Sequence, residues 1–173
     1  MSVETLKTAI RDIPDFPKPG IIFKDITPIL KDPEFFREAV SLLADGHAGK
    51  GIRKVAVIDA RGFLFGTAVA HQIGAGVVPI RKQGKLPYKT YEQQCELEYG
   101  TAVLAVHVDA FDKGEPVLLI DDLLATGGTA AAAAQLVEKA GGKIREIAFL
   151  IELGFLKGRA KLTRYPVRSI IRF

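Results

Sequence analysis

Short apolar runs alternate with longer amphipathic segments along most of this chain. The runs lie near residues 54–58, 76–80, 117–121, 144–151 and 167–172. Short apolar runs bounded by turn residues are typical of strands that are buried on both faces. Because segments with a helical pattern separate most of these runs, the sequence predicts a parallel sheet whose connections are right-handed crossovers.

The other segments predict helices and loops around that sheet. Helices are expected at residues 2–13, 33–46 and 63–73, in a segment from about residue 130 to Gly141, and in part of the mixed segment 152–162. Residues 14–20 contain three prolines and predict a turn, followed by an extended piece at 21–26. Polar residues from 81 to 100 predict a long loop of the kind that acts as a lid, and residues 101–108 an exposed strand.

Length and composition narrow the class of protein. A chain of 173 residues fits one domain with a full core. Cys95 is the single cysteine, so no internal disulfide is possible, and the N-terminal residues show no signal-peptide pattern. We therefore expect a cytoplasmic protein without a membrane span. The net charge of +4 is compatible with anionic small substrates or weak nucleic-acid affinity and does not decide between them.

The chemistry is concentrated in residues 116–129, PVLLIDDLLATGGT. Asp121 and Asp122 follow the apolar run directly, and the small residues 125–129 lead into an alanine-rich helix. Free N–H groups and the helix dipole make such a turn an anion site. Adjacent carboxylates suit hydroxyls or a hydrated Mg²⁺, so the combination predicts a sugar-phosphate site. A TGGT turn alone could serve turn chemistry only, and the absence of a Gly-Lys-Ser/Thr sequence disfavours an ATP-binding P-loop.

A second polar turn follows the apolar run 54–58. Asp59, Ala60 and Arg61 stand where this strand should meet a helix, which is the usual ligand edge of an open α/β sheet. Arg61 offers a planar fork for a phosphate, although a surface ion pair with Asp59 is an equally good interpretation. Further along, Arg81, Lys82 and Lys85 form a basic cluster that alone would indicate a solvated face.

Four separated motifs, FPKPGIIFKDIT, RKQGKLP, LEYG and VLLIDDLLATGGT, resemble the adenine branch of the type I phosphoribosyltransferases. The resemblance spans nearly the whole chain. It implies an α/β fold with a central parallel sheet flanked by helices, a small N-terminal hood and a flexible catalytic loop. The implied organisation is a single domain over residues 1–173, with the hood at about 1–32 and the core at about 33–173.

The resemblance also implies a role for each matching residue. Asp121 and Asp122 would hold the ribose hydroxyls of phosphoribosyl pyrophosphate (PRPP), and Phe23 would stack on adenine, whose edge the main chain of Ile22 and Lys24 would contact. Glu98 would be the catalytic acid or base, with Tyr99 beside it. The residues implied for the 5′-phosphate are Ala125, Thr126, Gly127, Gly128 and Thr129. Those implied for pyrophosphate are Asp59, Ala60, Arg61, Arg81, Lys82 and Lys85. The family more often has Glu where this chain has Asp59.

The implied reaction joins adenine and PRPP to give AMP and pyrophosphate, with Mg²⁺ as cofactor and a homodimer as the assembly. Two other functions stay open from the residues. One is a regulator that binds PRPP or nucleotides to control nucleic-acid binding, although the sequence has no added helix-turn-helix. The other is an enzyme of the same fold that uses hypoxanthine, guanine or xanthine, because backbone groups can read either kind of purine.

Overall fold

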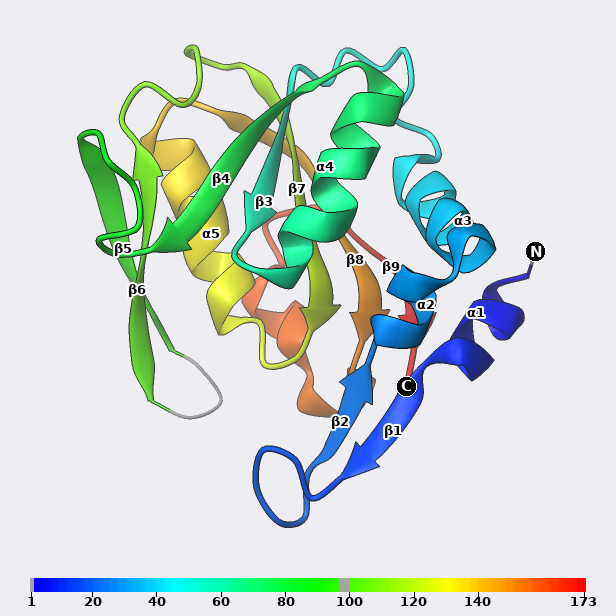
Figure 1. The fold of residues 1–173 in the computed structure, drawn as a ribbon. Coiled ribbons are helices and arrows are strands. Elements are labelled where there is room, and N and C mark those ends of the chain that lie inside the picture. Colours follow the sequence, from blue (N-terminus) through cyan, green and yellow to red (C-terminus); the bar gives the residue numbers. More distant parts are fainter. Residues whose placement is uncertain (1, 97–99) are drawn as a thin grey trace.

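Seven strands form one central sheet in this computed structural model, which describes residues 2–96 and 100–173 (Figure 1). The strand order is β5-β6-β4-β3-β7-β8-β9. Strands β4, β3, β7, β8 and β9 run parallel, whereas β6 pairs antiparallel with β4 and with β5. The strands are β3 (Lys54–Ile58), β4 (Gly76–Lys82), β5 (Thr90–Glu96), β6 (Thr101–His107), β7 (Pro116–Leu124), β8 (Lys143–Glu152) and β9 (Val167–Arg172). The predicted α/β class, with a central and mostly parallel sheet, is confirmed.

Helices cover both faces of this sheet and bury two groups of apolar side chains. The helices are α1 (Val3–Ala9), α2 (Thr27–Lys31), α3 (Pro33–Ala44), α4 (Arg61–Ile73) and α5 (Gly128–Lys139), with 3₁₀ turns η1 (Gly154–Leu156) and η2 (Gly158–Lys161). Apolar residues of α1 to α4 pack on one face, and those of α5 pack on the other (Figure 1). The central strands are therefore buried on both sides, as their continuous apolar runs require.

The N-terminal region forms a small separate sheet. Strands β1 (Arg11–Pro14) and β2 (Ile22–Asp25) pair antiparallel, and their hairpin projects beyond the carboxyl ends of β7 and β8 (Figure 1). The prediction of one helix over residues 2–13 is wrong in its second half, because the helix ends at Ala9 and β1 begins at Arg11. Pro14 disfavours helical backbone at the preceding residue, and pairing with β2 satisfies the backbone instead.

Two other expectations need correction. Strand β5 runs through the middle of the predicted long loop, because every residue from Thr90 to Glu96 pairs with β6. Strand β6 is not an exposed strand, since three consecutive residues in it are buried, with β4 and β5 on its two sides and α5 packed against it. Both errors have one cause. The polar residues of β5 do not indicate a strand by themselves, because its pairing partner, β6, lies in the next segment of the chain.

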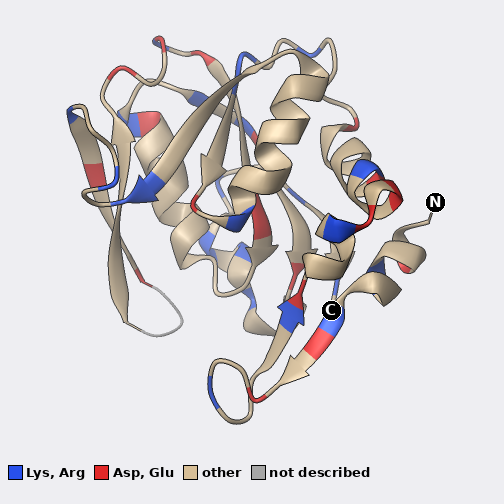
Figure 2. Cartoon of the chain, viewed as in Figure 1, with Lys and Arg blue, Asp and Glu red and all other residues tan. Residues whose placement is uncertain are grey.

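Two strands extend further than their apolar runs. Strand β4 continues to Lys82, because Arg81 and Lys82 pair with β6. Strand β7 continues to Leu124, because Leu123 and Leu124 pair with β8, so Asp121 and Asp122 lie within the strand. Basic and acidic positions are interspersed over the elements (Figure 2). None of the helices in residues 2–96 and 100–173 has both the length and the apolar character needed to cross a membrane.

Candidate active site

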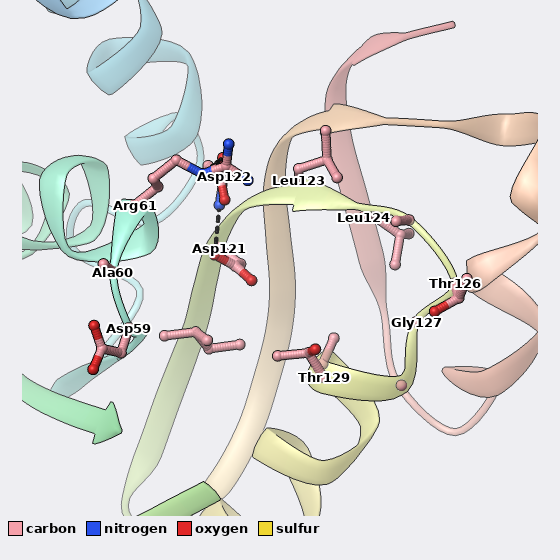
Figure 3. Close-up of a pocket in the computed structure, with 14 residues that line it drawn as sticks. Asp59, Ala60, Arg61, Asp121, Asp122, Leu123, Leu124, Thr126, Gly127 and Thr129 are labelled. Atoms are coloured by element: carbon pink, nitrogen blue, oxygen red, sulfur yellow. Dashed lines mark hydrogen bonds and ion pairs between the residues drawn. The ribbon is translucent and has the colours of Figure 1, made fainter. Parts of the chain in front are cut away.

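Two polar turns meet in one cavity at the carboxyl edge of the sheet. The turn after β3 and the stretch from the end of β7 into α5 enclose a volume of about 340 Å³ (Figure 3). The lining includes all the predicted residues of these two turns: Asp59, Ala60, Arg61, Asp121, Asp122, Ala125, Thr126, Gly127, Gly128 and Thr129. Because β3 and β7 are neighbouring parallel strands, segments about 60 residues apart in sequence come together here.

On β7, Asp122 is buried and Asp121 is partly buried, and the charges of the two carboxylates are only partly compensated. The Asp122 amide donates a hydrogen bond to Asp121 Oδ1 at 2.9 Å, and Arg61 Nε lies 2.9 Å from Asp122 Oδ2 (Figure 3). Asp122 is 4% exposed, and its buried Oδ2 accepts no well-directed hydrogen bond from the described residues. An under-satisfied buried oxygen at a cavity is a candidate contact for a ligand.

Burial and mutual repulsion shift the titration of this pair. Burial of the carboxyl, followed by the negative charge of Asp122, raises the pKa of Asp121 well above its usual value. Burial also raises the pKa of Asp122, although the charge of Arg61 opposes that increase. Hydroxyl donors or a cation from a ligand would relieve both effects, which is the electrostatic condition expected of a binding site.

Close approach of backbone brings the two turns together. Gly62 follows Arg61 in the first turn of α4, and a Cβ at Gly62 would lie 2.9 Å from Asp121 Oδ1. A side chain there would displace the carboxyl group or the helix. Sequence analysis did not identify Gly62 as a site residue, although a glycine directly after Arg61 at a helix start was an available signal.

The glycine-rich turn leads into the N-terminus of α5. Helix α5 starts at Gly128, its N-cap Gly127 has a φ of +80°, and no side chain caps the helix. The N–H groups of the first turn are therefore left for a ligand, at the positive end of the helix dipole. Twelve residues of helix support that dipole. The arrangement fits an anion such as a phosphate.

A second, more apolar cavity of about 600 Å³ adjoins the first. The hood supplies Ile22, Phe23 and Lys24, as predicted for a base pocket. The same cavity is also lined by Pro17, Gly20, Ile21, Arg61, Leu123, Ala125, Leu153, Phe155, Leu156 and Phe173. Three of these residues, Arg61, Leu123 and Ala125, also line the first cavity. The two cavities therefore share a wall.

Arg61 touches the functional groups of both cavities. Its guanidinium carbon lies 5.1 Å from the centre of the Phe23 ring, over which it sits, while Nε faces Asp122. Phe16 packs edge-on against Phe23 with ring centres 5.2 Å apart. Lys24 Nζ lies 2.6 Å from Asp12 Oδ1 and 4.0 Å from the centre of the Phe173 ring, which also lines this cavity. Phe23 thus presents an aromatic surface in the apolar cavity.

The predicted pyrophosphate group is brought together only in part. Arg81 Nε donates to Asp59 Oδ2 at 3.0 Å, so it is linked to the first turn, although Arg81 lines neither cavity. The peptide bond between Asp59 and Ala60 is cis. Lys82 and Lys85 are exposed and line neither cavity. These three basic residues lie on and after β4, and Arg81 is the one shown in contact with Asp59.

The predicted catalytic residues Glu98 and Tyr99 lie outside the described residues. Glu96 ends β5 beside the start of α5, and a Cβ on Gly128 would collide with the Glu96 carbonyl oxygen. Cys95 lies in the environment of an unreactive thiol, because the side chain is 3% exposed and burial raises the pKa of its thiol.

The oxygen ligands present could share a Mg²⁺ with a substrate but could not enclose one. No group of three His, Cys, Asp or Glu side chains in residues 2–96 and 100–173 is placed to hold a metal. Asp121 and Asp122 are hard oxygen donors, and Mg²⁺ commonly takes one or two carboxylates together with waters and substrate phosphates. The orphaned Asp122 Oδ2 is compatible with such a shared ion.

Sequence analysis missed the far wall of the apolar cavity. Leu153, Phe155 and Leu156 come from η1 and the residue before it, and Phe173 follows β9. The available signal was the apolar group LGFL directly after a buried strand, at the same sheet edge as the two polar turns. Phe155 is 70% exposed, which is unusual for a large apolar side chain unless a ligand or partner covers it.

Comparison with known proteins gives concordant results. A family model of the phosphoribosyl transferase domain matches residues 25–170. An adenine phosphoribosyltransferase of Methylacidiphilum infernorum is 54% identical over 172 residues, which is 99% of this chain and 96% of that protein. The crystal structure of adenine phosphoribosyltransferase from Thermoanaerobacter pseudethanolicus matches with a TM-score of 0.95 and 51% identity, covering 99% of this chain and 100% of that one.

A third match carries a base in its structure. The Saccharomyces cerevisiae adenine phosphoribosyltransferase, crystallised with an imino-altritol bisphosphate and adenine, matches with a TM-score of 0.90 and 40% identity. The match covers 97% of each chain. Hood, sheet and glycine-rich turn therefore all lie within the shared fold.

Proposed function

The chain belongs to the phosphoribosyl transferase domain family, and we infer that it transfers the 5-phosphoribosyl group from PRPP to N9 of adenine. The products are AMP and pyrophosphate, so the reaction salvages a purine. One observation supports this function most strongly: an anion cavity with a carboxylate pair shares a wall with an apolar cavity that contains Phe23. A reaction that joins a sugar phosphate to a flat base needs such neighbouring sites.

The ribosyl phosphate would bind along β7 and α5. Its 5′-phosphate would accept hydrogen bonds from the amides of residues 125–129, supported by the dipole of α5. The 2′- and 3′-hydroxyls would donate to Asp121 and Asp122. Such donors would offset the burial of the carboxylates and the repulsion between them. The same unfavourable electrostatics that raise the pKa values of the pair therefore favour binding of the ribose.

Adenine would enter the hood cavity and stack on Phe23, with the main chain of Ile22 and Lys24 at its edge. In the structure, Arg61 lies over the Phe23 ring and beside Asp122. When both substrates bind, we expect the guanidinium to turn toward the pyrophosphate, which offers it two charged oxygens. That movement would free the Phe23 face and both carboxylates together.

Charge develops on both sides of the bond that breaks. Adenine N9 attacks the anomeric carbon while pyrophosphate leaves, so the ribosyl ring becomes positive and the departing oxygens become negative. Asp121 and Asp122 would lie on the side of the ring, and Arg61, together with Arg81 bonded to Asp59, would face the leaving group. Lys82, Lys85 and the main chain of Asp59 and Ala60 would complete that side. Glu98 would stabilise the ring or move a proton on adenine.

We include Mg²⁺ as the cofactor, held mainly by PRPP, with Asp121 and Asp122 as the residues that would share it. When bound, this ion would neutralise negative charge on pyrophosphate. Omission of Mg²⁺ is expected to abolish turnover while leaving thermal unfolding unchanged, because the fold does not depend on the ion.

The resemblance to the family also supports a homodimer. Light scattering after size exclusion would test this, and a mass near 18.8 kDa would contradict it. A single functional domain is supported by the shared core, in which Leu6 and Ile26 of the hood region pack with Val55 and Leu118 of the sheet. A cytoplasmic location is supported by the lone, buried Cys95.

The decisive experiment measures nucleotide formation from PRPP and Mg²⁺ with adenine, hypoxanthine, guanine or xanthine in parallel. We expect AMP from adenine and no comparable product from the other bases. Turnover of a 6-oxopurine instead would retain the PRPP site and refute the adenine assignment. PRPP binding without turnover of any base would instead favour a regulatory protein.

A further inference from the structure

Gly158 lies directly against the phosphate loop, defined here as residues 125–129. A Cβ on Gly158 would lie 3.0 Å from the Gly127 amide nitrogen and would collide with the Ala125 carbonyl oxygen. Conversely, a Cβ on Gly127 would lie 3.0 Å from the Gly158 carbonyl carbon. The two backbones therefore touch with no side chain between them. The position of Gly158 determines where the back of the phosphate loop can lie.

The segment that carries Gly158 consists of two short 3₁₀ turns. Its backbone is tied to the rest of the molecule at its start, where the Leu153 amide donates to the Leu124 carbonyl and the Gly154 amide to the Phe173 carbonyl, both at 2.9 Å. Lys157, between η1 and η2, has a φ of +54°. Such short 3₁₀ turns have poorer hydrogen-bond geometry than an α-helix, so side-chain contacts are needed to hold η2 in place.

Arg159 supplies those contacts. Its Nε donates to both carboxylate oxygens of Glu152 at 2.9 Å, Nη1 donates to the Val167 carbonyl at 2.8 Å, and Nη2 donates to Ser169 Oγ at 3.2 Å. All three nitrogens of the guanidinium are thus used, which fixes the plane of the group. Glu152 is 3% exposed at the end of β8. Arg159 therefore fastens η2 to both β8 and β9.

We propose that Arg159 is a positioning residue for PRPP, which holds Gly158 against the phosphate loop so that the loop amides are oriented before the 5′-phosphate arrives. Arg159 lines neither cavity, so it would act through its neighbour rather than on the substrate. The proposal rests on the function given above, because it assigns a 5′-phosphate to this loop. Preorganised donors bind an anion without the cost of ordering them.

The chain contains a matched control at the other end of the same two strands. Arg168 on β9 donates through Nε to Glu146 on β8 at 2.8 Å. Its Nη1 and Nη2 donate to the carbonyls of Leu42 and Leu43 in α3 at 3.0 and 2.8 Å. The bonding resembles that of Arg159, but neither Arg168 nor Glu146 lines a cavity or touches the phosphate loop. Loss of this pair tests for a purely structural effect.

The experiment compares R159K with R168K in the full-length protein. For each, we would measure kcat, the KM for PRPP at saturating adenine, the Kd of PRPP without a base, and the thermal midpoint. R159K should raise the KM and Kd for PRPP by roughly tenfold to a hundredfold, as loss of ligand positioning usually does. Its kcat at saturating PRPP should stay within about threefold of wild type, because the reacting groups are unchanged. R168K should lower the midpoint and leave both PRPP constants unchanged.

Equal shifts of the PRPP constants in R159K and R168K, or wild-type constants in R159K, would overturn the proposal. S169A provides a milder variant if R159K does not fold, because it removes a hydroxyl that bonds both Arg159 and Glu152 and leaves the ion pair between those two residues in place. We expect S169A to weaken PRPP binding by a few-fold in the same direction, and an unchanged Kd would count against the proposal.

Wild-type protein separates this proposal from the proposed function. If the wild type binds PRPP but forms no AMP, the adenine assignment fails, whereas the Kd comparison still tests Arg159. If the wild type binds no PRPP, both fail. Normal AMP formation together with an unaltered Kd in R159K refutes the role of Arg159 alone.

Discussion

Two acidic sites lie near the carboxyl ends of neighbouring strands, and their surroundings shift the pKa values of the carboxyl groups in opposite directions. Asp122 on β7 is 4% exposed, and Glu152 at the end of β8 is 3% exposed. The strands pair directly, with Leu124 opposite Glu152. Burial raises the pKa of both Asp121 and Asp122, whereas the pKa of Glu152 is lowered in spite of burial. Burial alone therefore does not distinguish the two sites.

The difference lies in the partners that each carboxylate has. Burial is the largest influence on Glu152, but hydrogen bonds from Arg159 and Ser169, with the charges of Arg159 and Arg172, outweigh it. For Asp122 the charge of Arg61 does not outweigh burial, and Asp121 has a second carboxylate as its neighbour. A compensated buried acid holds structure together, whereas an uncompensated one awaits a ligand. The carboxylate pair on β7 is thus the functional one.

The largest effect expected from this comparison is that of the double variant D121N/D122N. It removes both anionic acceptors for the ribose hydroxyls, so kcat/KM should fall by about 10²–10³, or about 2.7–4 kcal/mol of transition-state stabilisation. The same variant removes the repulsion between buried charges, so its thermal midpoint at pH 7 should rise. Steady-state AMP formation and thermal unfolding measure the two effects.

A lower midpoint in D121N/D122N would contradict the view that the charges of this pair are only partly compensated. The single variant D59N is a suitable control for charge removal at the same edge of the sheet. Asp59 has Arg81 as its partner at 3.0 Å, so its loss should destabilise the protein slightly rather than stabilise it.

The next largest effect is expected of E152Q, which should destabilise the protein where D121N/D122N stabilises it. The change leaves Arg159 with a neutral partner and should lower the free energy of unfolding by about 1.5–3 kcal/mol, the range for hydrogen bonds to charged groups. Urea unfolding at pH 7 would measure it. E146Q is the matched control and should cost less, because the Glu146 side chain is 23% exposed. Equal stability of E152Q and wild type would show that Glu152 is not compensated as described.

The smallest effect is a difference in pH dependence. The folded-state pKa values of the β7 pair are raised, so its contribution to stability is complete below the unfolded pKa and is lost as the pH rises through the raised values. The excess stability of D121N/D122N over wild type should therefore shrink as the pH falls from 7 to 5.

Glu152 should behave in the opposite way. Its folded-state pKa is lowered, so its contribution is present above the unfolded pKa, near 4.3, and is lost as the pH falls through the lower folded value. The deficit of E152Q relative to wild type should be constant between pH 7 and about 5. Unfolding curves for wild type, D121N/D122N and E152Q across this range would test both pH dependences. If the stability differences of the two variants from wild type changed with pH in the same way, the two sites would not differ as described.

The phosphate loop illustrates what could be read from contiguous residues. An apolar strand, two carboxylates, a glycine-rich turn and an alanine-rich helix follow one another within residues 116–139, and the structure has them in that order. Local backbone preferences act over a few residues, so each part is encoded where it stands. The position of Arg61 at the next strand end followed from the same rule for parallel sheets.

Strand β5 illustrates what such a pattern could not reveal. Its polar alternation was interpreted as a loop, since the strand exists only because β6 pairs along its whole length. The apolar wall at Leu153, Phe155 and Leu156 was missed for a similar reason, because those residues become a pocket only when the hood lies opposite them.

By itself the sequence determined the order of the parallel strands with most of their helices, and the residue types at the carboxyl ends of β3 and β7. Only the tertiary structure decided which charges are compensated and which backbones touch. Arg61 meets Asp122 and Gly158 meets Gly127 across sequence separations that no local pattern spans, and Arg159 meets Val167 and Ser169 of β9 only because β9 returns beside β8. The physical reason is that conformational preference is a property of a few neighbouring residues, whereas burial, charge compensation and close packing depend on every element that surrounds a group.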